Sequence, residues 1–174
     1  MNRSFKRIVI FGNSGSGKSS LANMLSAEFK ITHLDLDILA WLDAKPPQRK
    51  PLADSLEEIN FFVQKNQEWV IEGCYADLLE HVIKNANEIV FLNKDIETCI
   101  SNCKKRPWEQ HKYKSQEEQN NNLEMLIDWV KEYPNRTDEF SLKAHKQLFD
   151  DFSGKKTEYI SNHQTNDGLE NYHE

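Results

Sequence analysis

The stretch that decides the fold is IVIFGNSGSGKS, residues 8–19. Its first four residues are an unbroken apolar run, which is typical of a short parallel strand covered on both faces. The remaining eight match G-x-x-x-x-G-K-[ST] at every fixed position. Leu21, Met24 and Leu25 then follow at helical spacing. The order strand, glycine loop, helix is the context in which this pattern, the Walker A loop, binds nucleotide phosphates.

Each residue type in this loop has a physical role. Glycines let the backbone turn tightly around a phosphate and point its N–H groups inward. The helix that begins near Lys18 adds its positive end, Lys18 reaches the β- and γ-phosphates, and the Ser19 hydroxyl is a natural Mg²⁺ ligand. A glycine-rich turn could match by chance, but three of the six glycines of the chain fall in this loop. The sequence therefore predicts ATP and Mg²⁺ as cofactors, with the nucleotide bound by Gly12, Asn13, Ser14, Gly15, Ser16, Gly17, Lys18, Ser19 and Ser20.

Working outward from the loop, apolar runs alternate with helical patterns. Repeated strand–helix alternation predicts a parallel, doubly wound α/β sheet. We expect one domain over residues 1–161, followed by a polar tail at 162–174. The predicted strands cover 8–11, 32–35, 69–71, 88–92 and 157–160, and the last three predicted helices cover 95–106, 115–133 and 138–149.

The composition restricts the partners. The chain has 174 residues, 29% of them charged, and a formal net charge of −6, which argues against nucleic-acid binding by the chain as a whole. No apolar run approaches the ~20 residues that a membrane span needs, so we expect a cytoplasmic protein. Cys99 and Cys103 lie four apart on a predicted helix without further metal ligands nearby, which predicts buried, inert thiols rather than a metal site.

Three acidic residues follow predicted strands. Asp35 and Asp37 would point to the same side if the second strand stays extended, at the sheet edge where ligands bind in parallel sheets. Either could hold Mg²⁺ through water or accept a proton from an attacking hydroxyl, or they could be a helix N-cap and a solvated acid. Glu72 ends the third strand, where it is a candidate Walker B-type carboxylate or part of a structural turn.

Two basic segments interrupt this acidic chain. The first contains Arg49 among prolines, and the second, residues 104–114, carries five basic residues and one acid. Such segments are commonly solvated surface, but cations on a closing flap suit phosphoryl transfer, and Arg106 is the best single candidate. Trp41 could line an acceptor pocket or pack its loop down.

The chain resembles the adenylate kinase-like P-loop kinases, and within them the bacterial topology modulation proteins related to the flagellar regulator FlaR. The resemblance covers residues 7–160. Beyond the Walker A loop it depends on residues 33–35 (HLD) with Trp41 downstream, 68–75 (EWVIEGCY), and 89–92 (IVFL) followed by the helix to Arg106.

This resemblance implies a P-loop NTPase fold, in which a five-stranded parallel sheet is sandwiched between helices, with a small acceptor flap at about 40–52 and a lid at about 107–115. It places Asp35 near Mg²⁺ and the acceptor, and Arg106 at the lid base. The chain departs from its relatives at residues 72–75, which read EGCY rather than Asp-Gly-Asn-Tyr, at Asn102, where an arginine is common, and in a lid of lysines. Lysine lacks the two-pronged geometry with which arginine holds a phosphate.

The favoured function is an ATP-dependent kinase of an unidentified nucleotide, nucleoside or hydroxylated metabolite. The alternatives are a nucleotide-dependent switch or slow ATPase that regulates a partner, and a nucleotide-binding module without catalysis. Neither the acceptor nor the oligomeric state is specified by the sequence. The predicted catalytic residues are Lys18, Asp35 and Arg106, the predicted metal ligands Ser19 and Asp35, and the predicted substrate residues Asp37, Trp41, Arg49 and Glu72.

Overall fold

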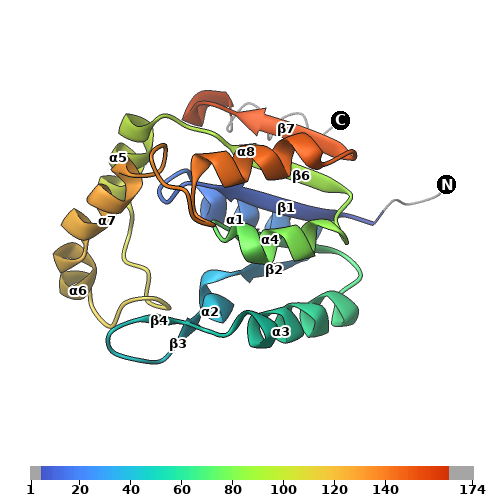
Figure 1. Ribbon diagram of the computed structural model, residues 1–174, viewed down its shortest axis with the longest axis horizontal. Coiled ribbons are helices and arrows are strands. Elements are labelled where there is room, and N and C mark those ends of the chain that lie inside the picture. Colours follow the sequence, from blue (N-terminus) through green and yellow to red (C-terminus); the bar gives the residue numbers. More distant parts are fainter. Residues whose placement is uncertain (1–4, 165–174) are drawn as a thin grey trace.

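Five parallel strands form one sheet in the order β2–β5–β1–β6–β7 in the computed structural model, which describes residues 5–164 (Figure 1). The predicted five-stranded parallel fold is therefore confirmed, and β1 lies at the centre of the sheet. The strands are β1 (Arg7–Gly12), β2 (Thr32–Asp35), β5 (Trp69–Gly73), β6 (Glu88–Leu92) and β7 (Lys155–Tyr159).

The apolar run of β1 is buried on both faces, as an unbroken hydrophobic strand requires. Val9 and Phe11 face one side of the sheet, and Phe11 stacks on Phe91 of β6 with ring centroids 5.2 Å apart. Ile8 and Ile10 face the other side, where they pack against α1. This alternation gives the domain two hydrophobic layers with the sheet between them.

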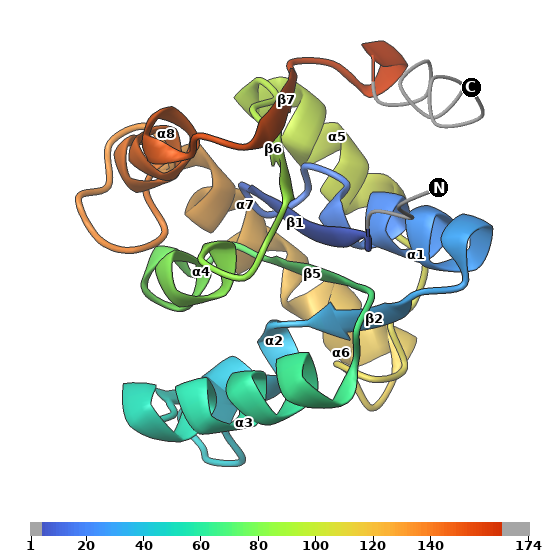
Figure 2. The same cartoon turned by 90° about the vertical axis from the view of Figure 1, so that its right-hand side faces the viewer.

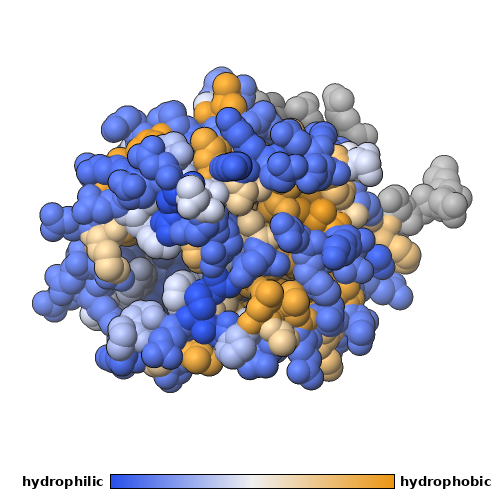
Figure 3. All heavy atoms as spheres, viewed as in Figure 1, coloured by the Kyte–Doolittle hydropathy of each residue, from blue (hydrophilic) through white to orange (hydrophobic). Residues whose placement is uncertain are grey.

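Helices cover both faces of the sheet (Figure 2). On one face α1 (Lys18–Phe29) packs against β1 and β5, and α5 (Ile96–Lys105) packs against α7 (Leu123–Lys131). On the other face lie α3 (Leu52–Lys65), α4 (Ala76–Ile83) and α8 (Leu142–Asp151). The face drawn in Figure 3 is mainly hydrophilic, because most large apolar side chains lie in these layers.

Some elements differ from the sequence-based expectations. The predicted helix over 115–133 is two helices, α6 (Gln116–Asn121) and α7, which meet at Asn122. The last helix begins later than predicted because the Ser141 side chain caps it by accepting a hydrogen bond from the Ala144 N–H. Residues 37–49 contain the unpredicted helix α2 (Asp37–Ala40) and a hairpin of β3 (Trp41–Leu42) and β4 (Gln48–Arg49).

The predicted polar tail is fixed at its start. Asn162 exchanges hydrogen bonds with Asn102 of α5 and accepts one from Lys94, so this residue packs against the domain. The rest of that prediction, residues 165–174, lies outside the described residues. Within residues 5–164, no helix has the length and apolar character needed to cross a lipid bilayer.

A buried histidine joins three parts of the fold. His145 of α8 is fully buried, its Nε2 donates to the Cys74 carbonyl (2.8 Å), and its Nδ1 accepts from the Tyr133 hydroxyl (2.7 Å). Burial lowers the pKa of His145 to about 4. The imidazole is therefore neutral at pH 7, and it holds the chain directly after β5, where Cys74 begins the connection to α4.

This pKa predicts a pH-dependent stability. In the unfolded chain His145 titrates near its usual value of about 6.5, so between pH 6.5 and 4 the unfolded state binds more protons and the folded state loses stability as the pH falls. We expect the free energy of unfolding in urea to drop by about 2 kcal/mol from pH 7 to pH 5 through this residue. His145→Gln should lose that pH dependence. His81→Gln, which alters a histidine near the surface, should keep it, and equal pH dependence in both variants would contradict the assignment.

Candidate nucleotide and acceptor site

The glycine loop runs from the end of β1 to the start of α1 and packs against α5. Gly15 has φ +75°, and a Cβ there would lie 2.3 Å from the Cys99 carbonyl oxygen and 2.6 Å from Cys103 Sγ. Only glycine fits that approach without strain. The two cysteines are buried and free, as predicted, and they form the surface on which the loop rests.

The inside of the loop fits a phosphate group. Lys18 Nζ donates to the Asn13 carbonyl (2.8 Å), and Asn13 Nδ2 donates to the Val130 carbonyl (3.1 Å), which ties the loop to α7. Ser16 Oγ is buried and has no hydrogen-bond partner among the described residues. The cavity is lined by Ser14, Gly15, Gly17 and Lys18 of the loop but not by Ser16, so the charge that an anion needs comes from Lys18.

A contact between α1 and β5 brings together two oxygen-bearing side chains that could hold Mg²⁺. Ser19 Oγ donates to Glu72 Oε1 at 2.7 Å, and Glu72 is almost completely buried. Glu72 comes to the loop because it pairs with Ile10 in the β1–β5 register. A hydroxyl and a carboxylate are oxygen ligands that suit Mg²⁺. Residues 5–164 hold no cluster of three His, Cys, Asp or Glu side chains suited to a metal ion, so phosphate and water would complete the coordination.

Asp35 and Asp37 meet at one lysine of the segment that was predicted as the lid. Lys112 Nζ lies 2.7 Å from Asp37 Oδ2 and 3.3 Å from Asp35 Oδ2. The strand does not stay extended, because Asp35 Oδ1 accepts the Asp37 N–H (2.9 Å) and α2 begins there. The sequence predicted that an extended strand would point both carboxylates to the same side. In the structure they lie together because the chain turns into α2 at Asp37. Asp35 is also the register partner of Glu72.

The pKa values of the two aspartates are shifted in opposite directions. Burial, together with Glu72 and Asp37, raises the pKa of Asp35 above its usual value. Burial would also raise the pKa of Asp37, but Lys112 and the Tyr75 hydroxyl hold it below its usual value. Burial opposes the charge of Lys112, yet Asp37 and Asp35 raise its pKa. Of the two carboxylates, Asp35 therefore takes up a proton more readily than Asp37.

A cavity of about 680 Å³ joins the glycine loop to this acidic group. The predicted residues that line it are Ser14, Gly15, Gly17, Lys18, Ser19, Ser20, Asp37, Glu72 and Arg106. Gly12, Asn13, Ser16 and Asp35 do not line it. Arg106 is half-buried, and its Nη1 is paired with Glu109 Oε2 at 3.0 Å. The opposite wall consists of residues 105–113, which include Trp108 and His111.

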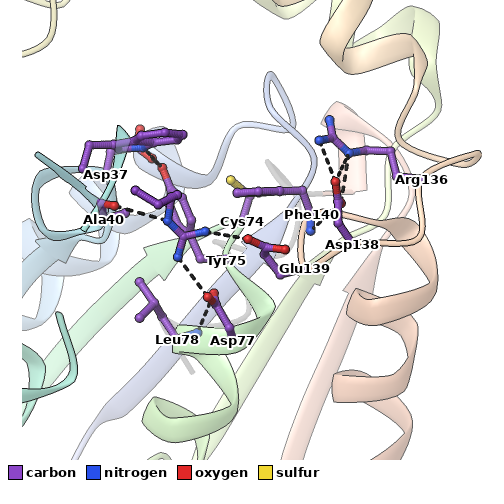
Figure 4. A network of polar contacts seen from close by, with 12 residues as sticks. Asp37, Ala40, Cys74, Tyr75, Asp77, Leu78, Arg136, Asp138, Glu139 and Phe140 are labelled. Atoms are coloured by element: carbon purple, nitrogen blue, oxygen red, sulfur yellow. Dashed lines mark hydrogen bonds and ion pairs between the residues drawn. The ribbon is translucent and has the colours of Figure 1, made fainter. Parts of the chain in front are cut away.

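Arg49 and Trp41 do not line the cavity. The Arg49 guanidinium is fixed by Glu139 (2.8 Å), Asp77 (2.9 Å) and the Ala40 carbonyl (3.2 Å). These three partners are labelled in Figure 4. Trp41 Nε1 donates to the Tyr75 hydroxyl (2.7 Å). Of the four predicted substrate residues, Arg49 and Trp41 thus lie outside the cavity.

Tyr75 connects this network to the cavity. Its hydroxyl donates to Asp37 Oδ1 at 2.6 Å, and its ring packs under the Arg49 guanidinium, 4.9 Å from the centroid. Arg49 and Trp41 therefore contact the cavity only indirectly. They hold Tyr75 in place, and Tyr75 orients Asp37.

Sequence reasoning missed Lys94, which lines the cavity beside the glycine loop. It lies two residues beyond the carboxyl end of β6, the strand next to β1. Ligands of parallel sheets bind outside the carboxyl ends of the strands, and this rule could have identified it.

Comparison with known proteins agrees with this geometry. A curated relative, the uncharacterized protein YqaC of Bacillus subtilis (strain 168), is 30% identical over 87 residues, which are 50% of this chain and 48% of that protein. The match thus spans about half the length of that relative.

Solved structures share the fold. A shikimate kinase from Acinetobacter baumannii, solved in complex with shikimate, superposes with a TM-score of 0.55 at 12% identity, over 97% of this chain and 92% of that chain. An uncharacterized protein from Eubacterium ventriosum ATCC 27560 superposes with a TM-score of 0.50 at 16% identity, over 97% and 98% of the two chains. Residues 8–127 match the family described as AAA domain. This chain belongs to that AAA domain family and has a P-loop NTPase fold like that of the kinases.

Proposed function

We propose that this protein is an ATP-dependent small-molecule kinase. The observation that carries the proposal is the Ser19–Glu72 hydrogen bond beside Lys18, in a cavity that Asp37 also lines. Residues 12–20 would bind the ATP phosphates, and Ser19 and Glu72 would hold Mg²⁺, with Asp35 as the neighbouring carboxylate. The bound Mg²⁺ would neutralise charge on the phosphate oxygens.

Asp35, Lys18 and Arg106 would have different roles in phosphoryl transfer. The acceptor oxygen bonds to the γ-phosphorus while the bond to the β–γ bridging oxygen breaks, and ADP leaves. Asp35 accepts the hydroxyl proton, because burial and the carboxylates of Glu72 and Asp37 raise its pKa and so favour its protonated form. Lys18 stabilises charge on the γ-phosphate. Arg106 lies on the cavity wall, where closure of the 107–115 lid would exclude water.

We further place the chain near the FlaR-related topology modulation proteins, on the strength of residues 33–35 and 68–75. The proposed domain covers 1–161, with the β3–β4 hairpin inside an acceptor flap at about 40–52. We expect the protein in the cytoplasm. Its proposed partners are a nucleotide and a small-molecule acceptor, and neither a nucleic acid nor a membrane.

A nucleotide-dependent switch is the second candidate, and one observation favours it. Lys112 neutralises both Asp35 and Asp37, so the proposed base is engaged by the lid. If this pairing persists with ATP bound, the protein would bind nucleotide and hydrolyse it slowly.

The charges of the cavity favour an uncharged or positively charged acceptor. Asp37 and Glu72 line the cavity, and the nearby Arg49 is occupied by Asp77 and Glu139. Once Lys112 leaves Asp37, a phosphate or carboxylate on the acceptor would meet like charges there and no free arginine of the flap. A site that binds an anionic acceptor would need arginines that are free to contact it, whereas Arg49 of this flap is already paired.

The first prediction concerns Lys18 and Glu72. Lys18→Ala should lower kcat/KM for ATP on the order of 100-fold, since it removes a fixed charge at the γ-phosphate. Glu72→Gln should raise the Mg²⁺ concentration for half-maximal rate by roughly tenfold. ADP release measured against Mg²⁺ gives both values. Lys84→Ala and Glu80→Gln, which remove the same charges from exposed positions, should behave like the wild type.

The second prediction concerns the acceptor. Glucose, glucosamine and glucuronate share a ring but differ in charge, so we expect any transfer to favour glucosamine and glucose over glucuronate by at least about tenfold. The measurement is ADP formed together with phosphorylated sugar. A preference for the acid would contradict the charge argument. ATP binding with only slow phosphate release, for these and other hydroxylated acceptors, would support the switch instead.

A further inference from the structure

Lys94 is a buried cation that has no counter-charge among the described residues. It follows β6, and only 5% of its surface is exposed. Its Nζ donates to the Asn162 side-chain carbonyl at 2.9 Å. Within residues 5–164 it forms no ion pair with any carboxylate. Buried lysines ordinarily have such a partner, because a buried charge without one is costly.

The surroundings make a positive charge still less favourable there. A Cβ on Gly17 would lie 3.3 Å from Lys94 Nζ, so the ammonium is next to the first turn of α1. The amino end of a helix carries partial positive charge. Burial, and then Lys18, lower the pKa of Lys94, although Cys99 opposes them. Burial, a helix amino end and a neighbouring lysine thus all disfavour a cation at this position.

An anion in the cavity would reverse each of these effects. Lys94 lines the cavity together with Gly17 and Lys18, so a bound phosphate chain would meet both ammonium groups and the α1 N–H groups. A contact between opposite charges is stronger than the hydrogen bond that the ammonium makes to the uncharged amide of Asn162. In the protein without ligand, the Asn162 carbonyl holds the ammonium in place.

We propose that Lys94 is a second phosphate-binding cation, which contacts the polyphosphate chain of the nucleotide together with Lys18. The identity of the anion as a nucleotide polyphosphate depends on the proposed function. Lys94 is a binding and positioning residue.

The test compares stability and affinity in the same variants. Lys94→Met should raise the melting temperature of the ligand-free protein or leave it unchanged, because it replaces a buried charge with an apolar side chain of similar length. The same change should weaken Mg²⁺-ATP binding at least tenfold and AMP binding less, since AMP has a single phosphate. Lys104→Met, an exposed change on α5, is the charge-matched control and should alter neither value.

Asn162→Ala separates this role from a structural one. If Lys94 only anchored the segment after β7, Lys94→Met and Asn162→Ala would destabilise the free protein to the same extent and lower the affinity for ATP equally. That result would overturn the proposal. We expect the tenfold loss of ATP affinity in Lys94→Met alone. Unchanged ATP affinity in Lys94→Met would also overturn it.

A failure of the proposed function gives a different result. If no acceptor is phosphorylated but Lys94→Met still weakens ATP binding, the Lys94 proposal holds and the proposed kinase function is overturned. If the wild type binds no ATP, the same variants are titrated with inorganic triphosphate. Loss of triphosphate-induced stabilisation in Lys94→Met, but not in Lys104→Met, would then support an anion site, and equal stabilisation would overturn it.

Discussion

The site depends on the parallel pairing of β1 with a strand on each side. On one side the register places Glu72 of β5 opposite Ile10, two residues before the loop. On the other side it pairs Leu92 of β6 with Gly12, so that Lys94 comes next to the loop. Because β1 lies at the centre of the sheet, one glycine loop receives a carboxylate from one neighbour and a cation from the other. A one-residue shift in either register would turn these side chains to the opposite face of the sheet.

Cations and carboxylates lie close together around the cavity. Lys18 and Lys94 line it at the glycine loop, and Asp37 and Glu72 line it as well. Lys112 neutralises Asp37 and its neighbour Asp35. Catalysis would require Lys112 to leave the aspartates, and this couples the lid to the proposed base.

The sequence predicted the parts of the structure that follow local rules. Residues 8–19 specified a strand, a glycine loop and a helix, since backbone conformation and hydrophobic burial act over a few residues there. Strands 32–35 and 88–92 matched β2 and β6 for the same reason. The hairpin 41–49 escaped prediction, because its two-residue strands are held by Arg49 contacts with Asp77 and Glu139, residues distant in the chain.

The sequence by itself thus determined the fold class, the phosphate loop and the list of candidate acids. Only the tertiary structure decided how those side chains are paired. Arg49 and Asp35 both looked available for a ligand, yet Arg49 is bound by two carboxylates, while Asp35 faces a lysine 77 positions further along the chain. The physical reason is that charge pairing depends on distance in space, which strand register and helix packing set and which residue spacing alone does not encode.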